Sequence, residues 1–204
     1  MESIVSSPVT FALLAANIVA SFVAFTVPDF LAQNSLWIRP IRDQKQYHRM
    51  LTSGFLHVNF THLLVNMMTL YFFGPPLENT IGSTSFALLY FGSLIGGSIW
   101  EVVDKRNKPD YRAIGASGAI SGLMSAVGLL FPFAMIYVFF ALPIWAGLYA
   151  LIFIVVSFIY SQKENTMIAH GAHLGGAIAG IVMTLILVPG AIGHLMQQIA
   201  GKFG

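Results

Sequence analysis

The feature of this sequence that most constrains its fold is a series of apolar runs close in length to a bilayer-crossing helix. A bilayer core takes about 20 apolar residues as α-helix. The runs lie at residues 9–27, 53–73, 84–103, 117–131, 143–160 and 166–188. They predict an all-α membrane protein, a six-transmembrane-helix bundle that forms a single domain over residues 1–204.

The composition supports a membrane protein and excludes several classes of function. Hydrophobic residues make up 56% of the chain and charged residues only 9%, too few charges to cover the surface of a soluble domain. The net charge of +2 and the lack of a basic run argue against a nucleic-acid partner. The sequence has no cysteine, which excludes disulfides, thiol catalysis and thiolate metal sites. We predict no cofactor.

We expect a multi-pass protein of a cell membrane, plasma or inner, in contact with lipid. The start of the sequence, Met1–Ser3, lacks the basic region of a secretory signal peptide, so the first run is expected to remain as a span. The oligomeric state cannot be predicted from these patterns.

Lys and Arg residues are distributed unevenly between the two sides of the predicted bundle. With six spans, the connections 28–54, 104–115 and 162–165 share one side of the membrane, and only Lys202 lies on the other. Nine of the ten Lys and Arg residues are on the first side: Arg39, Arg42, Lys45, Arg49, Lys105, Arg106, Lys108, Arg112 and Lys163. The positive-inside rule places that side in the cytoplasm.

Ser117 begins the fourth run, in the sequence Gly115-Ala116-Ser117-Gly118. A hydroxyl at the N-terminal end of an apolar helix needs a hydrogen-bond partner or a function. Gly118 and Gly122 are four residues apart, so another helix can approach this one closely. The run is only about 15 residues long, which places Ser117 some distance below the membrane surface.

His173 lies at a similar depth, about seven residues into the sixth run. Small residues surround it at helical spacing: Ala169, Gly176, Ala177 and Gly180. Serine is a weak nucleophile until a base takes its proton, and histidine is the usual base. We therefore predict a Ser117–His173 dyad. No acidic residue lies at that depth, so the third member of a triad is missing.

The second run adds two polar residues, His62 and Asn66, four apart and hence on one helix face. They lie at the same depth as Ser117, and with its backbone N–H they can donate hydrogen bonds to a developing oxyanion. We expect Gly74-Pro75-Pro76 to end this helix.

Taken singly, polar residues in spans most often form hydrogen bonds between helices. We retain that interpretation for His57 and His170, as packing or interface residues, and for Ser121 and Ser125, as packing residues. For Ser117, His173 and Asn66 the agreement in depth and spacing favours a site.

These residues resemble the motifs of the rhomboid intramembrane serine proteases. The matching segments are Gly115-Ala116-Ser117-Gly118, Ala172-His173-x-x-Gly176-x-x-x-Gly180 and His57-x-x-x-x-His62-x-x-x-Asn66, and the resemblance extends over about residues 47–180. It implies a six-helix core with a water-accessible cavity that hydrolyses peptide bonds of transmembrane protein substrates. By resemblance Ser117 is the nucleophile, His173 the general base, and His62 and Asn66 stabilise the oxyanion. It also implies a site that opens outward, against the charge bias.

Two positions depart from the family pattern. The family often has Trp-Arg before the second span, whereas this chain has His48-Arg49. Many members have a tyrosine four residues after the nucleophile that stacks on the base; here that residue is Ser121. The support for the His173 ring must therefore come from elsewhere.

Three other functions are open to a chain of this kind. A catalytically silent rhomboid-like protein would bind membrane clients without cutting them. A His-lined transporter is disfavoured because no acid is predicted deep in the bundle and the halves are not inverted repeats. A metal site is weaker still, because His57 and His62, five apart, are expected to point apart on a helix.

Overall fold

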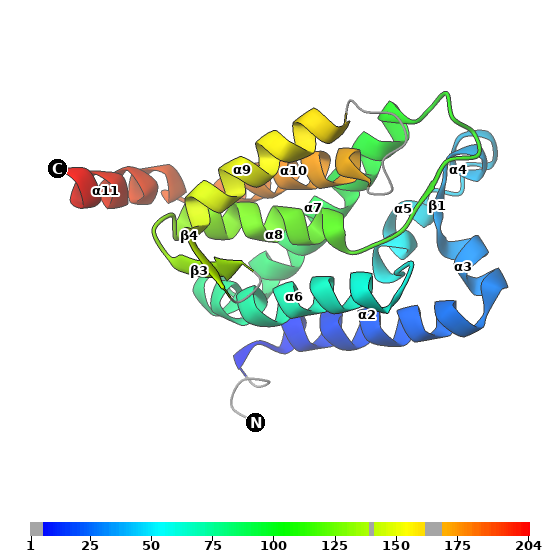
Figure 1. The fold of residues 1–204 in the computed structure, drawn as a ribbon, viewed down its shortest axis with the longest axis horizontal. Helices are drawn as coiled ribbons and strands as arrows, with labels where there is room; N and C mark the ends of the chain where they lie inside the picture. The colour runs from blue at the N-terminus through cyan, green and yellow to red at the C-terminus, as the bar shows by residue number, and fades with distance from the viewer. Residues whose placement is uncertain (1–5, 139–140, 162–168) are drawn as a thin grey trace.

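The computed structural model describes residues 6–138, 141–161 and 169–204. The helical elements are α2 (Pro8–Thr26), α3 (Pro28–Asn34), α4 (Ile38–Gln44), α5 (Arg49–Thr52), the 3₁₀ turn η1 (Ser53–Phe55), α6 (Phe60–Ile81), α7 (Ser83–Asp104), α8 (Ser117–Leu130), α9 (Ala146–Ser161), α10 (His170–Leu187) and α11 (Ala191–Phe203). Two antiparallel pairs join β1 (Leu36–Trp37) to β2 (Arg112–Ala113), and β3 (Met135–Val138) to β4 (Leu142–Trp145). The fold is a bundle of helices with one small strand pair near each end (Figure 1).

Three of the described helices, α2, α7 and α10, are long and apolar enough to cross a bilayer. The apolar helices α8 and α9 are shorter, at 14 and 16 residues. At 1.5 Å per residue, α8 covers about 21 Å of a core of about 30 Å, which suits a helix that begins below the surface. A mostly helical membrane fold is thus confirmed, while the number of six spans stays a prediction. The predicted turn 162–165 and residues 166–168 lie outside the described residues.

Helix α8 lies at the centre of the bundle and contacts α6, α7, α9 and α10 (Figure 1). Every residue of α8 except Ser117 and Leu129 is buried. Its small residues explain this position, because glycine and serine let the neighbouring backbones come close. Side chains of α2, α6 and α7 complete the apolar core around it.

The predicted close approach of the fourth and sixth runs is confirmed. A Cβ placed on Gly176 would overlap the backbone carbonyl of Gly118, and one placed on Gly180 would overlap the backbone of Gly122. Helix α7 packs into the same seam, since a Cβ on Gly97 would lie 2.6 Å from the carbonyl oxygen of Ala172. These three helices therefore meet backbone to backbone.

The second run differs from its prediction at both ends. Helix α6 begins at Phe60, not at residue 53, because the Asn59 side chain caps it by accepting a hydrogen bond from the His62 N–H at 2.8 Å. The helix continues through Pro75 and Pro76 to Ile81, so the expected end at Gly74 was wrong. Tertiary contacts beyond the prolines, described next, hold this last part of the helix in place.

Glu78 anchors the end of α6 to the beginning of α2. Its carboxylate is 1% exposed and accepts hydrogen bonds from Val9 N (3.0 Å), Thr10 N (2.8 Å), Thr10 Oγ1 (2.7 Å) and Ser83 Oγ (2.6 Å). The backbone N–H groups belong to the first turn of α2, where a helix leaves its donors unsatisfied and favours a negative charge. A buried carboxylate is tolerated here because both of its oxygens accept hydrogen bonds.

We expect Glu78→Ala to lower the free energy of unfolding by about 2–4 kcal/mol, because it leaves several buried donors without an acceptor. Thermal unfolding in detergent measures this. Thr80→Ala is the control, since Thr80 is exposed on the same helix and its hydroxyl bonds only within it. Equal unfolding temperatures for the two variants would contradict the anchoring role.

The fifth run was predicted to be helical from residue 143, but its first residues form strand β4. Pro143 lies opposite Tyr137 in the β3–β4 pair. Proline lacks an N–H, and a two-stranded ribbon accepts it more readily than the interior of a helix. Helix α9 begins only after the strand, where Ala146 N donates to Ala134 O at 2.9 Å. The all-α prediction therefore holds for the bundle but not for the connections.

The long connection 28–54 forms a folded unit beside the end of α7. Arg49, which matches the arginine of the family pattern, is buried and donates to the carbonyl oxygens of Ala32 (2.8 Å) and Ser35 (3.1 Å). A small core of Leu36, Ile38 and Ile41 packs against Val102 and Tyr111. Leu31, Ala32 and Ser35 of this connection line the cavity described next.

Candidate active site

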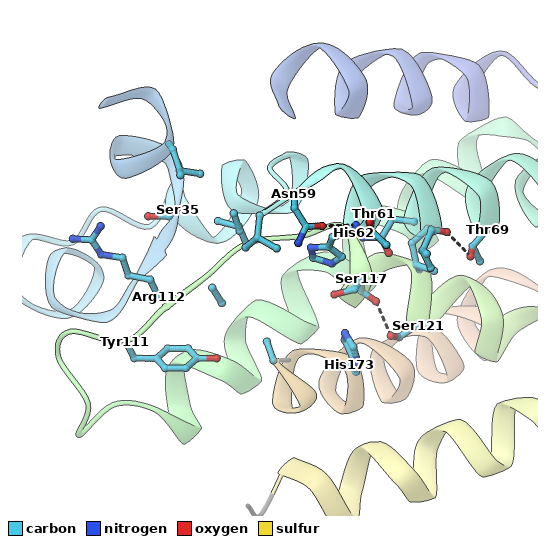
Figure 2. Close-up of a pocket in the computed structure, with 18 of the residues that line it drawn as sticks. Ser35, Asn59, Thr61, His62, Thr69, Tyr111, Arg112, Ser117, Ser121 and His173 are labelled. Atoms are coloured by element: carbon cyan, nitrogen blue, oxygen red, sulfur yellow. Dashed lines mark hydrogen bonds between the residues drawn. The ribbon is translucent and has the colours of Figure 1, made fainter. Parts of the chain in front are cut away.

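A cavity of about 940 Å³ lies between helices α6, α8, α9 and α10 and the segment before α8. All four residues singled out from the sequence, Ser117, His173, His62 and Asn66, line it. No carboxylate is among the described residues of the lining, although Glu78 and Glu101 are buried elsewhere in the bundle. Figure 2 shows Ser117 between His62 of α6 and His173 of α10.

Ser117 owes its position to the turn before α8. Gly115 has φ of 137°, a conformation that favours glycine, and its N–H donates to Ser53 O at 3.0 Å. A Cβ on Gly115 would lie 2.7 Å from His62 Cε1 and 3.6 Å from Ser117 Oγ. Glycine at this position therefore lets the imidazole of His62 approach the segment that carries Ser117.

Ser121 and Ser125 hydrogen-bond within their own helix. The Ser121 hydroxyl donates to Ser117 O at 2.6 Å, and the Ser125 hydroxyl donates to Ser121 O at 3.0 Å. Such bonds occupy the hydroxyl donors and leave small buried groups on the packing face of α8. Both residues are buried in α8, and Ser121 also lines the cavity; their packing role stays a prediction.

His173 lies in the first turn of α10, and in Figure 2 its ring is directed toward Ser117. Within the described part of the chain no hydrogen bond joins the two side chains. Contacts between a nucleophile and its base are often long without substrate and shorten in the reacting complex. The arrangement supplies a hydroxyl and an imidazole from two adjacent helices to one cavity.

His62 and Asn66 carry unused hydrogen-bonding atoms. His62 Nδ1 and Asn66 Nδ2 are buried and have no partner among the described residues. Leaving such atoms unpaired costs free energy, so sites that keep them are often binding sites. Both residues line the cavity beside Ser117, where an oxyanion would find donors.

His57 lies outside α6 and has a structural partner. Its Nδ1 is 2.8 Å from Ser21 Oγ, and its ring centroid is 5.0 Å from that of His62. The expectation that the two imidazoles point apart was wrong, because Leu56 is extended and the helical spacing argument does not apply before Phe60. His57 is buried, and its packing role stays a prediction. Among the described residues no group of three His, Cys, Asp or Glu could hold a metal ion.

Sequence reasoning missed the aromatic support of His173. Phe153 of α9 stacks on the His173 ring with centroids 5.7 Å apart and planes 29° apart. His170 approaches the same ring edge-on at 5.7 Å, and Tyr160 lies beside His170 at 5.2 Å. The sequence gives no signal for Phe153, since one phenylalanine in an apolar run looks like any other.

Sequence reasoning also missed a tie between the segment before Ser117 and the start of α10. The fully buried Glu101 of α7 accepts a hydrogen bond from the Tyr111 hydroxyl, and a Cβ on Gly171 would lie 2.5 Å from Glu101 Oε2. Burial raises the pKa of Tyr111, and the adjacent Glu101 raises this pKa further, so the phenol stays a donor. A carboxylate near a helix N-terminus is stabilising. Glu101 thus links the two segments that carry Ser117 and His173.

Comparison with known proteins identifies the family. A Rhomboid domain model matches residues 44–190. The chain belongs to the rhomboid family. Membership accounts for the apolar helices and the fold of a membrane-embedded protease-like bundle, and it confirms the resemblance found in the sequence motifs.

Relatives of this rhomboid protein come from several sources. It is 26% identical over 190 residues to "Rhomboid-like protein 16, chloroplastic" of Arabidopsis thaliana, covering 81% of this chain and 59% of the relative. It is 33% identical over 141 residues to "Rhomboid protein 1, mitochondrial" of Saccharomyces cerevisiae, covering 64% and 39%. To YdcA of Bacillus subtilis it is 45% identical over 78 residues, 38% of each chain. The matched stretches thus cover between 38% and 59% of the length of these three relatives.

The names of these relatives give information on the cellular compartment. Two of the three relatives are named for a chloroplast or a mitochondrion, so the comparisons support a membrane protein but give no support to the plasma membrane. The compartment of this rhomboid protein therefore stays a prediction.

Proposed function

We propose that this rhomboid protein is an intramembrane serine protease that hydrolyses peptide bonds of transmembrane protein substrates. The observation that supports it most is that Ser117 and His173 face one cavity from two helices that pack backbone to backbone at Gly118 and Gly176. Membership of the rhomboid family agrees with this assignment.

The chemistry follows from the groups that line the cavity. Ser117 Oγ attacks the carbonyl carbon of the scissile bond while His173 takes the hydroxyl proton. The resulting oxyanion is met by Asn66 Nδ2, by His62 and by the backbone N–H of Ser117 at the start of α8. His173 then gives the proton to the leaving amine, and a water molecule, activated by His173 in turn, releases the acyl group from Ser117.

Labelling with a serine-directed fluorophosphonate tests the proposal. The wild type should be labelled on Ser117, as located by peptide mass spectrometry, and Ser117→Ala should not be labelled. His173→Ala should be labelled far more slowly, because the base is gone. A folded wild type that stays unlabelled would favour the catalytically silent, client-binding alternative.

The transporter alternative is weaker because the described lining of the cavity holds no carboxylate to relay an ion or proton. Proteoliposome flux that survives in Ser117→Ala, with no cleavage by the wild type, would restore it.

We expect Asn66→Ala to lower kcat by about 10²–10³, the usual cost of removing one oxyanion donor, with KM little changed. His62→Ala should lower kcat in the same direction and somewhat less. Initial rates on a model transmembrane substrate measure both effects. Asn107→Ala, at an exposed position in the charged connection, is the matched control. Wild-type kcat in both site variants would reduce Asn66 and His62 to packing residues.

A further inference from the structure

Among the described residues, the side chains that contact the His173 ring as ring pairs are Phe153 and His170. Within the described part of the chain no hydrogen bond reaches either of its ring nitrogens, and the lining of the cavity offers no carboxylate to orient it. An imidazole without such a partner can rotate about its two side-chain torsions, and each rotation moves the nitrogen that must take the proton. In a Ser–His dyad of this kind, some other contact must hold the imidazole in one orientation.

The contact that meets this need comes from α9. The Phe153 ring lies 5.7 Å from that of His173 at an interplanar angle of 29°, within the usual range of about 4.5–7 Å for an offset stack. Tyr149, one turn earlier, stacks on Phe153 at 6.2 Å and 22°. Three flat side chains therefore form a continuous stack that ends on the face of the base.

Helix α9 is built to present this stack to the bundle. Its buried residues, Ala146, Ala150 and Ser157, share one face with Phe153 at helical spacing. Ala150 is in close contact with α8, since a Cβ on Gly128 would lie 2.6 Å from the Ala150 Cβ. Small residues on this face draw α9 toward α8 and so bring the Phe153 ring to His173.

We propose that Phe153 is a positioning residue that holds His173 in the orientation needed to take the Ser117 proton. This inference rests on the proposed protease function. It supplies a ring contact that Ser121 cannot make, because serine stands here at the position where many rhomboid proteins have a tyrosine that stacks on the base. Here the flat support comes from α9, a different helix from the one that carries the nucleophile.

The position of Phe153 also predicts which kinetic constant responds. Phe153 is one of many residues that line the cavity, so leucine at this position leaves most of the surface available to a substrate in place. Without the Phe153 ring, the His173 imidazole should shift relative to the Ser117 hydroxyl. A misplacement of about 1 Å can cost on the order of 10² in rate. The effect should therefore fall on kcat rather than on KM.

The test compares replacements that keep or remove the flat face. Phe153→Leu should lower kcat by about 10–100-fold with KM within about two-fold, and fluorophosphonate labelling of Ser117 should slow to the same extent. Phe153→Tyr retains the ring and should keep kcat close to wild type. Phe158→Leu, on the exposed side of the same helix at 52%, is the control and should change neither constant. If the leucine variant does not fold, Phe153→Met removes the flat face at a similar volume and gives the same comparison.

Two results would overturn the inference. Wild-type kcat in a folded Phe153→Leu or Phe153→Met protein would show that the stack does not position the base. Equal losses in Phe153→Tyr and Phe153→Leu would show that the flat face is not what matters. In both cases the wild type is labelled on Ser117 and the protease function stands, whereas an unlabelled, inactive wild type would overturn the function and this inference together.

Discussion

Ser117→Ala and His173→Ala should each reduce cleavage of a transmembrane substrate by about 10⁴–10⁶, and the double variant should be no slower than either one. The reason is that the two side chains act as one unit. Without the base the hydroxyl is not activated, and without the hydroxyl the base has nothing to activate. Both residues line the cavity from the first turns of α8 and α10. Ser117→Ala removes only a hydroxyl, whereas His173→Ala also removes the ring that stacks on Phe153.

Thermal unfolding in detergent provides the control for this prediction, since both single variants should unfold within a few degrees of the wild type. Losses that simply add in the double variant would show that the residues act independently. Near-normal turnover in either single variant would remove that residue from the proposed mechanism.

The second large effect is expected from a residue that takes no part in the chemistry. Gly176→Val should lower the cleavage rate by about 10² or more and also lower the unfolding temperature. A side chain at Gly176 would overlap the backbone carbonyl of Gly118, the residue directly after Ser117. A backbone carbonyl cannot rotate away as a side chain can, so α8 and α10 must separate, and Ser117 and His173 separate with them.

The chain offers a matched control for this substitution. Gly193 in α11 has no atom within 4 Å of the position a Cβ would take, so Gly193→Val should change neither rate nor stability. Gly122→Val is a second variant at the seam, where the new side chain would overlap Ser93 of α7. Full activity in Gly176→Val would mean that the two helices do not meet there.

Much of the architecture follows from patterns that act over one or two helical turns. Bilayer-length apolar runs predict helices, and the Gly118–Gly122 spacing predicts a seam that the structure contains. Counting residues inward from one surface placed Ser117, His173 and Asn66 at one depth, and all three line one cavity. This reasoning works because the rise per residue of a helix is constant, and because the depth of a residue in every span is counted from the same membrane surface.

The features that sequence reasoning missed depend on contacts between distant residues. Helix α6 passes through Pro75 and Pro76 because Glu78, beyond them, binds the start of α2 some seventy positions earlier in the chain. The β3–β4 pair, which displaces the start of α9, differs in that its pairing is local, with Val138 opposite Leu142. Phe153 and Glu101 touch the segments around His173 only after the bundle has formed. Local propensity and hydropathy carry no information on such partners.

The central claim, that Ser117 cuts peptide bonds within the membrane, is tested most directly by incubating the purified protein with a single-span model substrate in proteoliposomes. Intact masses of the products should show two fragments that together equal the substrate plus one water, formed by the wild type and absent with Ser117→Ala. The same fragments at the same rate from folded Ser117→Ala would contradict the claim.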